Sequence, residues 1–111
     1  MEIQVQQMGA VTILKPMGPL AGPDAEQLRS QALQDATAAL GRLVLDASDV
    51  AFLDSAGIES LLDIGDELAR GCRALKLCSA NETVRKVLEL TGVTSSFEFF
   101  DDVNAAVRSF L

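Results

Sequence analysis

The chain of 111 residues carries nine basic and sixteen acidic residues, which gives a formal net charge of −7, and it contains no histidine. A chain of this length suffices for one domain with one apolar core, which we place over residues 1–111. The negative charge disfavours binding to nucleic acid or to an anionic membrane surface. No apolar run approaches the roughly 18–20 residues that cross a bilayer, and the first residues lack the pattern of a signal peptide. We therefore expect a cytoplasmic protein without membrane insertion.

The first part of the chain predicts a β-hairpin. Ile3 and Val5 alternate with polar residues, which is the period-two pattern of a half-buried strand. Gly9 supplies a turn, and the apolar run that follows predicts a second strand that ends at Pro16. The next segment, GPLAGPDAE, has the glycine and proline content of a loop.

The rest of the chain alternates between predicted helices and predicted strands. Apolar residues spaced three or four apart indicate helices, and short continuous apolar runs indicate strands that are covered on both faces. The helices fall at about residues 23–41, 58–71, 82–92 and 102–110, and the strands at 42–47, 73–79 and 96–100. The order ββαβαβαβα predicts a single α/β domain of about five strands and four helices, with a mixed but mostly parallel sheet whose antiparallel edge comes from the hairpin.

The two cysteines, Cys72 and Cys78, stand at the ends of one predicted strand. An extended strand of this length separates them by roughly 20 Å, whereas a disulfide requires Cα atoms within about 7 Å. We expect both to be reduced residues in or near the core. Without histidine or a Cys-x-x-Cys pair, no metal site is predicted.

The usual enzyme motifs are missing. A Ser-His-Asp triad lacks its imidazole base, and the Gly-x-Ser-x-Gly elbow is broken because residue 53 is leucine. Neither the phosphate-binding P-loop nor the Gly-x-Gly-x-x-Gly dinucleotide motif occurs. A receiver domain is disfavoured because Asp46, Asp49 and Asp54 gather around one strand only and no lysine follows the last strand. We expect neither catalysis nor a cofactor.

The segment Asp54-Ser55-Ala56-Gly57 follows a buried strand and precedes a helix. One interpretation is helix capping, in which the side-chain oxygen of Asp54 or Ser55 accepts a backbone N–H, while Gly57 lets helix and sheet approach closely. The other is that the Ser55 hydroxyl is exposed at the helix N-terminus, where the free N–H groups tolerate a phosphoryl group. Phosphorylation would add about −1.5 to −2 charges beside Asp54 and change the surface that a partner meets.

The run LVLDASDVAFLDSAGIESLL, followed by a strand and then SANETVRKVLELTGV, resembles the STAS domain of bacterial anti-sigma factor antagonists. The resemblance covers essentially the whole chain. It rests on an apolar strand, an Asp-Ser-x-Gly loop and a helix, followed by a second strand and a helix that ends near Thr-Gly.

The resemblance implies a non-catalytic switch between partners. The unphosphorylated antagonist binds an anti-sigma factor that is also a serine kinase, and so frees the sigma factor. Phosphorylation of the serine that matches Ser55 abolishes this binding, and a PP2C-type phosphatase reverses the modification. By position, the residues implied in partner binding are Gly18, Pro19, Leu20, Asp54, Ser55, Ala56, Gly57, Ile58 and Glu59.

Three departures from the family pattern stand out. Ala56 replaces the commoner Ser or Thr, which leaves Ser55 as the only hydroxyl in the loop, and Ile58 conservatively replaces Leu. GPLAGPDAE stands where the family commonly has a Gly-Glu-Leu-Asp-like string. This loop faces the partner in the family, so the difference bears on which partner is bound and not on the fold. Two alternative functions stay open on the same fold: a STAS subunit of an ABC-type lipid transport system and a regulatory scaffold protein.

The helix that follows the loop carries acidic residues mostly off its apolar face, namely Glu59, Asp63, Asp66 and Glu67. One interpretation is a solvated face that keeps the domain in solution. The other is that part of this face docks to a basic rim on the kinase.

Overall fold

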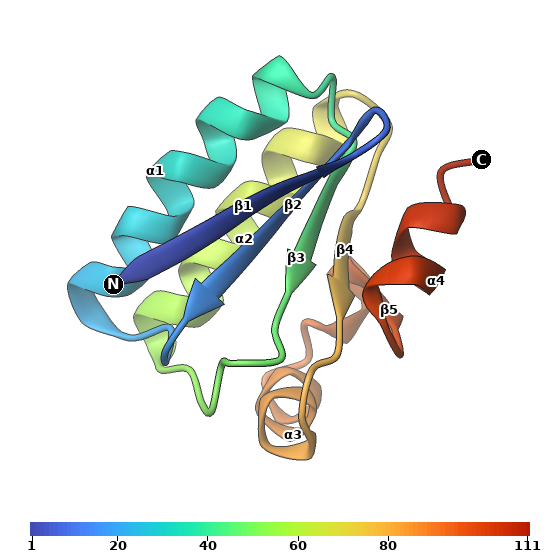
Figure 1. Cartoon of the computed structure of the whole chain (residues 1–111). Coiled ribbons are helices and arrows are strands. Elements are labelled where there is room, and N and C mark those ends of the chain that lie inside the picture. The colour runs from blue at the N-terminus through green and yellow to red at the C-terminus, as the bar shows by residue number, and fades with distance from the viewer.

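The computed structural model describes all residues from 1 to 111 and confirms the predicted order of elements (Figure 1). Five strands and four α-helices alternate along the chain after the initial hairpin, and one short 3-10 turn precedes the last strand. The elements are β1 (Glu2–Met8), β2 (Val11–Met17), α1 (Gly22–Ala38), β3 (Leu43–Asp46), α2 (Ser55–Arg70), β4 (Leu75–Cys78), α3 (Glu82–Leu90), η1 (Thr94–Ser96), β5 (Phe97–Phe100) and α4 (Val103–Arg108).

The five strands form one mixed sheet in the order β1-β2-β3-β4-β5. Only β1 and β2 run antiparallel, and the pairs β2–β3, β3–β4 and β4–β5 are parallel. Gly9 has a φ of 62° in the two-residue turn of the hairpin, a conformation that glycine adopts without steric cost. Both the fold class and the antiparallel edge are as predicted.

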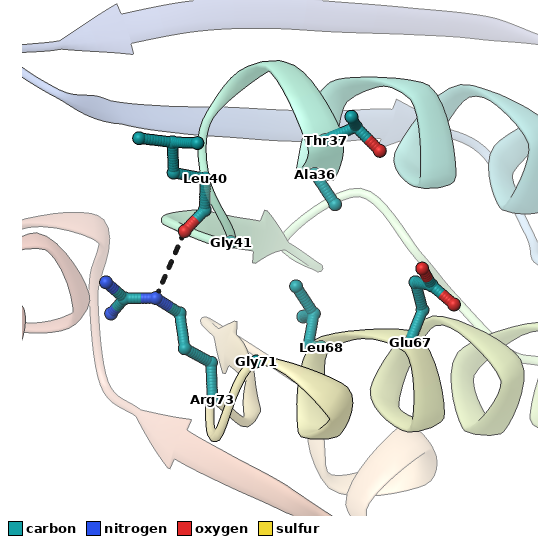
Figure 2. Close-up of a pocket in the computed structure, with 8 residues that line it drawn as sticks. All are labelled: Ala36, Thr37, Leu40, Gly41, Glu67, Leu68, Gly71 and Arg73. Carbon is teal, nitrogen blue, oxygen red and sulfur yellow. Dashed lines mark hydrogen bonds between the residues drawn. The ribbon is translucent and has the colours of Figure 1, made fainter.

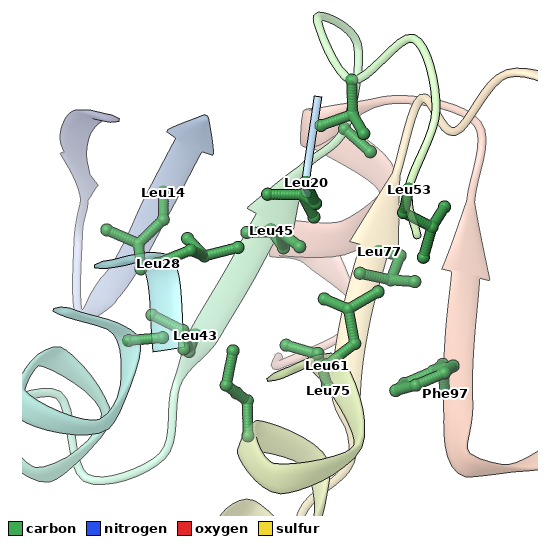
Figure 3. Close-up of a cluster of buried hydrophobic side chains, with 14 of the residues drawn as sticks. Leu14, Leu20, Leu28, Leu43, Leu45, Leu53, Leu61, Leu75, Leu77 and Phe97 are labelled. Atoms are coloured by element: carbon green, nitrogen blue, oxygen red, sulfur yellow. The ribbon is translucent and has the colours of Figure 1, made fainter. Parts of the chain in front are cut away.

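One face of the sheet is covered by α1 and α2, which lie side by side (Figure 1). The main core lies between these helices and the sheet, and Figure 3 shows leucines from three strands converging there with Leu28 of α1 and Leu61 of α2. β3 is buried along its whole length, as its continuous apolar run predicts. α2 begins at Ser55, after residues 47–54, which form the connection from the carboxyl end of β3.

The other face of the sheet is covered in part by α4, through a smaller apolar cluster around Ala106 and Cys78. Lys76 of β4 is buried on this face, and its ammonium group lies 2.7 Å from a carboxylate oxygen of Glu98. The same ammonium lies 5.3 Å from the ring centre of Phe100 and 4.6 Å from that of Phe110. Ion pairing and the two aromatic faces compensate for the desolvation of this charge.

Four details differ from the sequence predictions. Val5 is 49% exposed, because β1 forms the outer edge of the sheet, where no element covers its centre. β2 continues through Pro16 to Met17, and α1 begins near Pro23 as predicted but ends at Ala38, before the predicted Gly41. Cys72 is exposed in the turn after α2, so only Cys78 belongs to the core. Both cysteines are free, as predicted.

Candidate functional site

Asp54, and not Ser55, caps α2. The Asp54 backbone is extended, and its Oδ1 accepts a hydrogen bond from the backbone N–H of Gly57 at 3.0 Å. Its second oxygen, Oδ2, accepts the backbone N–H of Gly22 at 3.1 Å. Gly22 is the first residue of α1, so one carboxylate holds the starts of both helices. The sequence left the capping residue open between Asp54 and Ser55, and the structure assigns it to Asp54.

The two loops that lead into α1 and α2 are joined through their backbones. Leu20 forms an isolated parallel bridge with Leu53. The N–H of Leu20 donates to the carbonyl of Phe52 at 3.1 Å, and the N–H of Asp54 donates to the carbonyl of Leu20 at 3.1 Å. The GPLAGP loop is therefore fastened to the Asp-Ser-Ala-Gly loop, and the two form one continuous surface.

Gly57 allows this approach. A Cβ at residue 57 would overlap the carbonyl oxygen of Leu20 and lie 2.9 Å from the Cβ of Leu53. Real Cβ atoms essentially never come so close to backbone atoms, so a larger residue would force the two loops apart. The predicted role of Gly57 in close packing is confirmed, although its contact is with the loop before α1 and with Leu53.

The nine residues implied in partner binding lie together at this edge of the sheet, but they differ in accessibility. Leu20 is only 2% exposed and belongs to the core, and Gly57 is buried under it. The remaining seven present surface. Ser55 is exposed at the first position of α2, between exposed Asp54 and half-buried Ala56, while half-buried Ile58 and exposed Glu59 follow in the same turn and half-buried Gly18 and Pro19 lie in the other loop.

Phe52 and Asn81 are two further residues of this region that were not among the predicted site residues. The Phe52 side chain is 48% exposed, two positions before Asp54, while the side chain of neighbouring Leu53 is buried. Side chains alternate between the two sides of an extended segment, so the sequence could have indicated that either Phe52 or Leu53 points outward. The amide of Asn81 caps α3 and donates hydrogen bonds to the carbonyls of Val50 at 3.0 Å and Ala51 at 3.3 Å. Asn81 thus supports the loop between β3 and α2 from the end of the neighbouring strand.

Charge is unevenly placed between the two edges of the sheet. At the carboxyl edge, where the parallel strands end, exposed acidic residues follow β3, β4 and β5, namely Asp49, Asp54, Glu82, Asp101 and Asp102. At the amino edge, where these strands begin, three arginines gather, namely Arg42, Arg70 and Arg73. The exposed charges next to Ser55 along the chain are therefore acidic, namely Asp49, Asp54 and Glu59, whereas α3 after β4 also carries exposed Arg85 and Lys86.

The acidic face of α2 is partly neutralised within the chain. Asp63 accepts a hydrogen bond from Arg29 of α1 at 2.9 Å, and Glu67 pairs with Arg70 at 2.7 Å. Glu59 and Asp66 have no such ion pair and are exposed. Of the four acidic residues predicted on this face, Glu59 lies nearest to Ser55 along the helix.

The amino edge contains a small cavity of about 150 Å³ between the ends of α1 and α2 (Figure 2). Arg73 spans its mouth, and its Nε donates to the carbonyl oxygen of Leu40 at 3.2 Å. This cavity lies at the far end of α2 from Ser55, so it takes no part in the site. None of the helices is both long and apolar enough to cross a membrane.

The fold and this loop define an α/β domain of the STAS type. The STAS domain family model matches residues 2–106, and the chain therefore belongs to this family. In sequence it is similar to a protein of Bordetella bronchiseptica named as an anti-sigma factor antagonist, BtrV. The two are 26% identical over 110 residues, which cover 99% of this chain and 95% of that protein.

Solved structures agree on the fold. One from Thermotoga maritima, named as an anti-sigma factor antagonist, matches with a TM-score of 0.88 at 22% identity and covers 96% of this chain and 92% of its own. SpoIIAA, an anti-sigma factor antagonist of Bacillus, matches in its unphosphorylated form with a TM-score of 0.77 at 20% identity, over 98% of this chain and 96% of its own. Its phosphorylated form matches with a TM-score of 0.70 at 20% identity, over 97% of this chain and 99% of its own.

Proposed function

We propose that this protein is an anti-sigma factor antagonist that acts as a phosphorylation-controlled switch at Ser55. Unphosphorylated, it binds an anti-sigma factor that is also a serine kinase, and so releases the sigma factor. Phosphorylated on Ser55, it no longer binds. The protein itself performs no catalysis in this scheme, and a PP2C-type phosphatase restores the binding form.

The observation that carries the proposal is the position of Ser55. Its side chain is exposed at the first residue of α2, while the capping of that helix is performed by Asp54. The hydroxyl is therefore accessible to a kinase, and its modification leaves the cap in place. Because Ala56 lacks a hydroxyl, Ser55 is the only phosphorylatable residue of the Asp-Ser-Ala-Gly segment.

Two opposing effects would act on a phosphate at Ser55. The helix N-terminus favours negative charge, because its first N–H groups point outward and the helix dipole is positive there. The Asp54 carboxylate and the neighbouring acidic residues of the carboxyl edge repel it. The two Asp54 hydrogen bonds, to Gly57 and Gly22, hold that carboxylate beside the new charge. The domain therefore stays folded, whereas the partner surface becomes more negative.

The proposed binding surface joins the two fastened loops to the first turn of α2. It comprises Gly18, Pro19, Asp54, Ser55, Ala56, Ile58 and Glu59, while Leu20 and Gly57 shape it from below. Its charge fits a partner with a basic rim. In this scheme the basic rim contacts Glu59 and the acidic face of α2, whereas Ser55 faces negatively charged groups of the partner. A phosphate that is desolvated against those groups would cost several kcal/mol of binding free energy, on the order of 2–5 for an unpaired interfacial charge.

The proposal is tested by phosphoryl transfer. The serine kinases with a histidine-kinase-type ATP-binding fold from the same organism are purified, incubated with this protein and labelled ATP, and the modified residue is mapped by mass spectrometry. We expect one phosphate, on Ser55, and none on the Ser55→Ala variant.

Ser48 offers a matched control. It is also an exposed serine in the loop between β3 and α2, seven positions before Ser55, and Ser48→Ala should be phosphorylated like the wild type. Binding to the kinase should be weakened by Ser55→Asp and unaffected by Ser48→Asp. Phosphate on Ser48 instead of Ser55, or equal binding of wild type and Ser55→Asp, would contradict the proposal.

A lipid-transport subunit and a scaffold protein would share this fold, so the fold does not separate the three functions. Co-purification with a transporter ATPase, together with no phosphate on Ser55, would favour the transport function. The accessible Ser55 hydroxyl is the observation that favours the switch.

A further inference from the structure

β1 is an edge strand whose outer side is uncovered. It is seven residues long, the same length as β2, and it lies at the end of the sheet with no strand beyond it (Figure 1). The two-residue turn makes Met8 and Val11 the closing, hydrogen-bonded pair of the hairpin. Because hydrogen-bonding direction alternates along a strand, the backbone groups of Ile3, Val5 and Gln7 then point outward.

This edge lacks the features that usually prevent a strand from pairing with another chain. Those features are charged side chains, proline, bulges and shortness. β1 contains a single charge, at Glu2, contains no proline and pairs with β2 without interruption over its seven residues. The opposite edge of the sheet is formed by β5, which has only four residues.

The surface around β1 is rich in amides and poor in charge. All six glutamines of the chain lie in two elements: Gln4, Gln6 and Gln7 in β1, and Gln27, Gln31 and Gln34 in α1. The three in α1 follow one helical stripe, and Gln27 hydrogen-bonds both the amino group and the carbonyl of Met1, which precedes β1. The charges around β1, namely Glu2, Lys15 and the ion pair between the Met1 amino group and Asp24, are of both signs, which distinguishes this region from the acidic carboxyl edge.

We propose that β1 pairs with β1 of a second copy of this chain, antiparallel and centred on Val5, to form a continuous sheet across a two-fold axis. In this register Val5 faces Val5, Gln4 faces Gln6, Ile3 faces Gln7 and Glu2 faces Met8. No two like charges oppose each other, and glutamine amides can exchange hydrogen bonds across the axis. The outward groups of Ile3, Val5 and Gln7 meet their counterparts in about six backbone hydrogen bonds.

The dimer is a weak one. A single pair of strands buries less surface than the roughly 1,200–2,000 Å² of stable complexes, so the dissociation constant falls on the order of 10–100 µM. The pairing uses the backbone of β1 and no atom of Ser55, which is the first residue of α2.

Sedimentation velocity tests the proposal without a kinase, and therefore independently of the proposed switch. The wild-type chain is measured from about 5 to about 500 µM, a range that brackets the expected dissociation constant. We expect a shift from monomer to dimer mass with concentration. Hydrogen exchange at the amides of Ile3, Val5 and Gln7 should slow over the same range.

Two variants and a control complete the experiment. Val5→Lys places like charges opposite each other at the axis, and Val5→Pro removes an outward N–H that β2 does not use; each should raise the dissociation constant at least tenfold. Leu90→Lys, at a 77% exposed site in α3, should dimerise like the wild type. Circular dichroism confirms that each variant is folded. A wild type that is monomeric throughout, a dimer that both Val5 variants retain, or open-ended assembly would overturn the proposal.

Discussion

The two edges of the sheet that hold the ends of α2 are built in different ways. At the carboxyl edge, the start of α2 is fixed by Asp54, by the backbone hydrogen bonds between Leu20 and its neighbours Phe52 and Asp54, and by Gly57 under the carbonyl of Leu20. At the amino edge, Leu40 and Cys72 adopt left-handed conformations, with φ of 54° and 60°, and Leu40 lines a cavity of about 150 Å³ between the ends of the two helices.

This difference in packing indicates which end of α2 is held more firmly in place. The candidate switch lies on the edge where backbone atoms from two loops are in contact and no cavity separates them. A phosphate added there meets a surface whose shape is already fixed, so its effect on a partner is mainly electrostatic. Left-handed residues occur at both edges, since Ser79 after β4 has a φ of 59°, so the edges differ in packing: the amino edge, which carries no proposed site, retains a cavity.

The largest expected effect compares the glycines at the two ends of α2. Gly57→Ala places a methyl group against the carbonyl of Leu20 and the Cβ of Leu53. We expect it to lower the free energy of unfolding by about 2–3 kcal/mol, as overpacking does, measured by urea denaturation.

Gly71→Ala is the matched control at the other end. Its added Cβ would lie 3.7 Å from the carbonyl oxygen of Leu68, an ordinary contact, and its φ of −96° suits any residue. The change in stability should stay within about 0.5 kcal/mol. Equal losses of stability for the two substitutions would show that the start and the end of α2 are packed equally tightly.

The two edges also differ in their cysteines. Cys78 ends β4 at the carboxyl edge, whereas Cys72 lies at the amino edge. Burial, and then the nearby charge of Asp46, raises the pKa of the Cys78 thiol from its ordinary 9.0 to about 11. Between these values the unfolded chain loses the proton while the folded chain keeps it. Stability therefore falls as the pH rises from about 9 to about 11, by up to about 1.4 kcal/mol per pH unit.

Denaturation of wild type and Cys78→Ala across this pH range checks the prediction. The substitution lowers stability at neutral pH by removing a buried side chain, but it should flatten the decline above pH 9.0. Cys72→Ala, an exposed site, should leave the decline unchanged. Parallel slopes for wild type and Cys78→Ala would show that the buried thiol does not set this dependence.

A smaller effect is expected from the carboxylate that holds both helices. Asp54→Ala removes the acceptors for Gly57 and Gly22 and should cost about 1–2 kcal/mol. Asp54→Asn keeps one oxygen to accept from Gly57 and should cost less. Asp102→Ala removes a cap that only α4 uses, so it should cost about 1 kcal/mol or less. Guanidinium denaturation ranks the three, and a larger loss for Asp102→Ala would contradict the role given to Asp54.

The smallest expected effect is a gain at the amino edge. Leu40 is 70% exposed and has a φ of 54°, so its side chain adds little to the core while its backbone is strained. Leu40→Gly should raise stability by about 0.5–1 kcal/mol, because glycine adopts this conformation without steric cost. Thermal melting measures the shift, and a loss of stability would mean that Leu40 packs more tightly than its exposure indicates.

The sequence predicted most of the fold because its local signals agree with one another. The β3 run is continuously apolar, and α2 carries its apolar residues on one face from Ile58 to Leu68 and ends at Gly71 as predicted. Asp54 and Ser55 were both recognised as candidate caps. The order of strands and helices then restricts the topology to a mostly parallel sheet.

The remaining features depend on contacts between distant segments. The hydrogen bond between Gly22 and Asp54 joins residues 32 positions apart, and no local sequence pattern predicts it. The burial of Leu20 beside the Asp-Ser-Ala-Gly loop, which removes its side chain from the proposed partner surface, has the same origin. Cys72 was expected in or near the core because it adjoins an apolar run, but the turn after α2 carries it to the surface.

The most direct test of the account is calorimetric. A kinase that phosphorylates this protein is titrated with the unphosphorylated chain and with the chain phosphorylated stoichiometrically on Ser55. We expect phosphorylation to weaken binding at least about 100-fold, which corresponds to about 2.7 kcal/mol, while circular dichroism shows both forms equally folded. Affinities that agree within about twofold, a difference below about 0.5 kcal/mol, would contradict it.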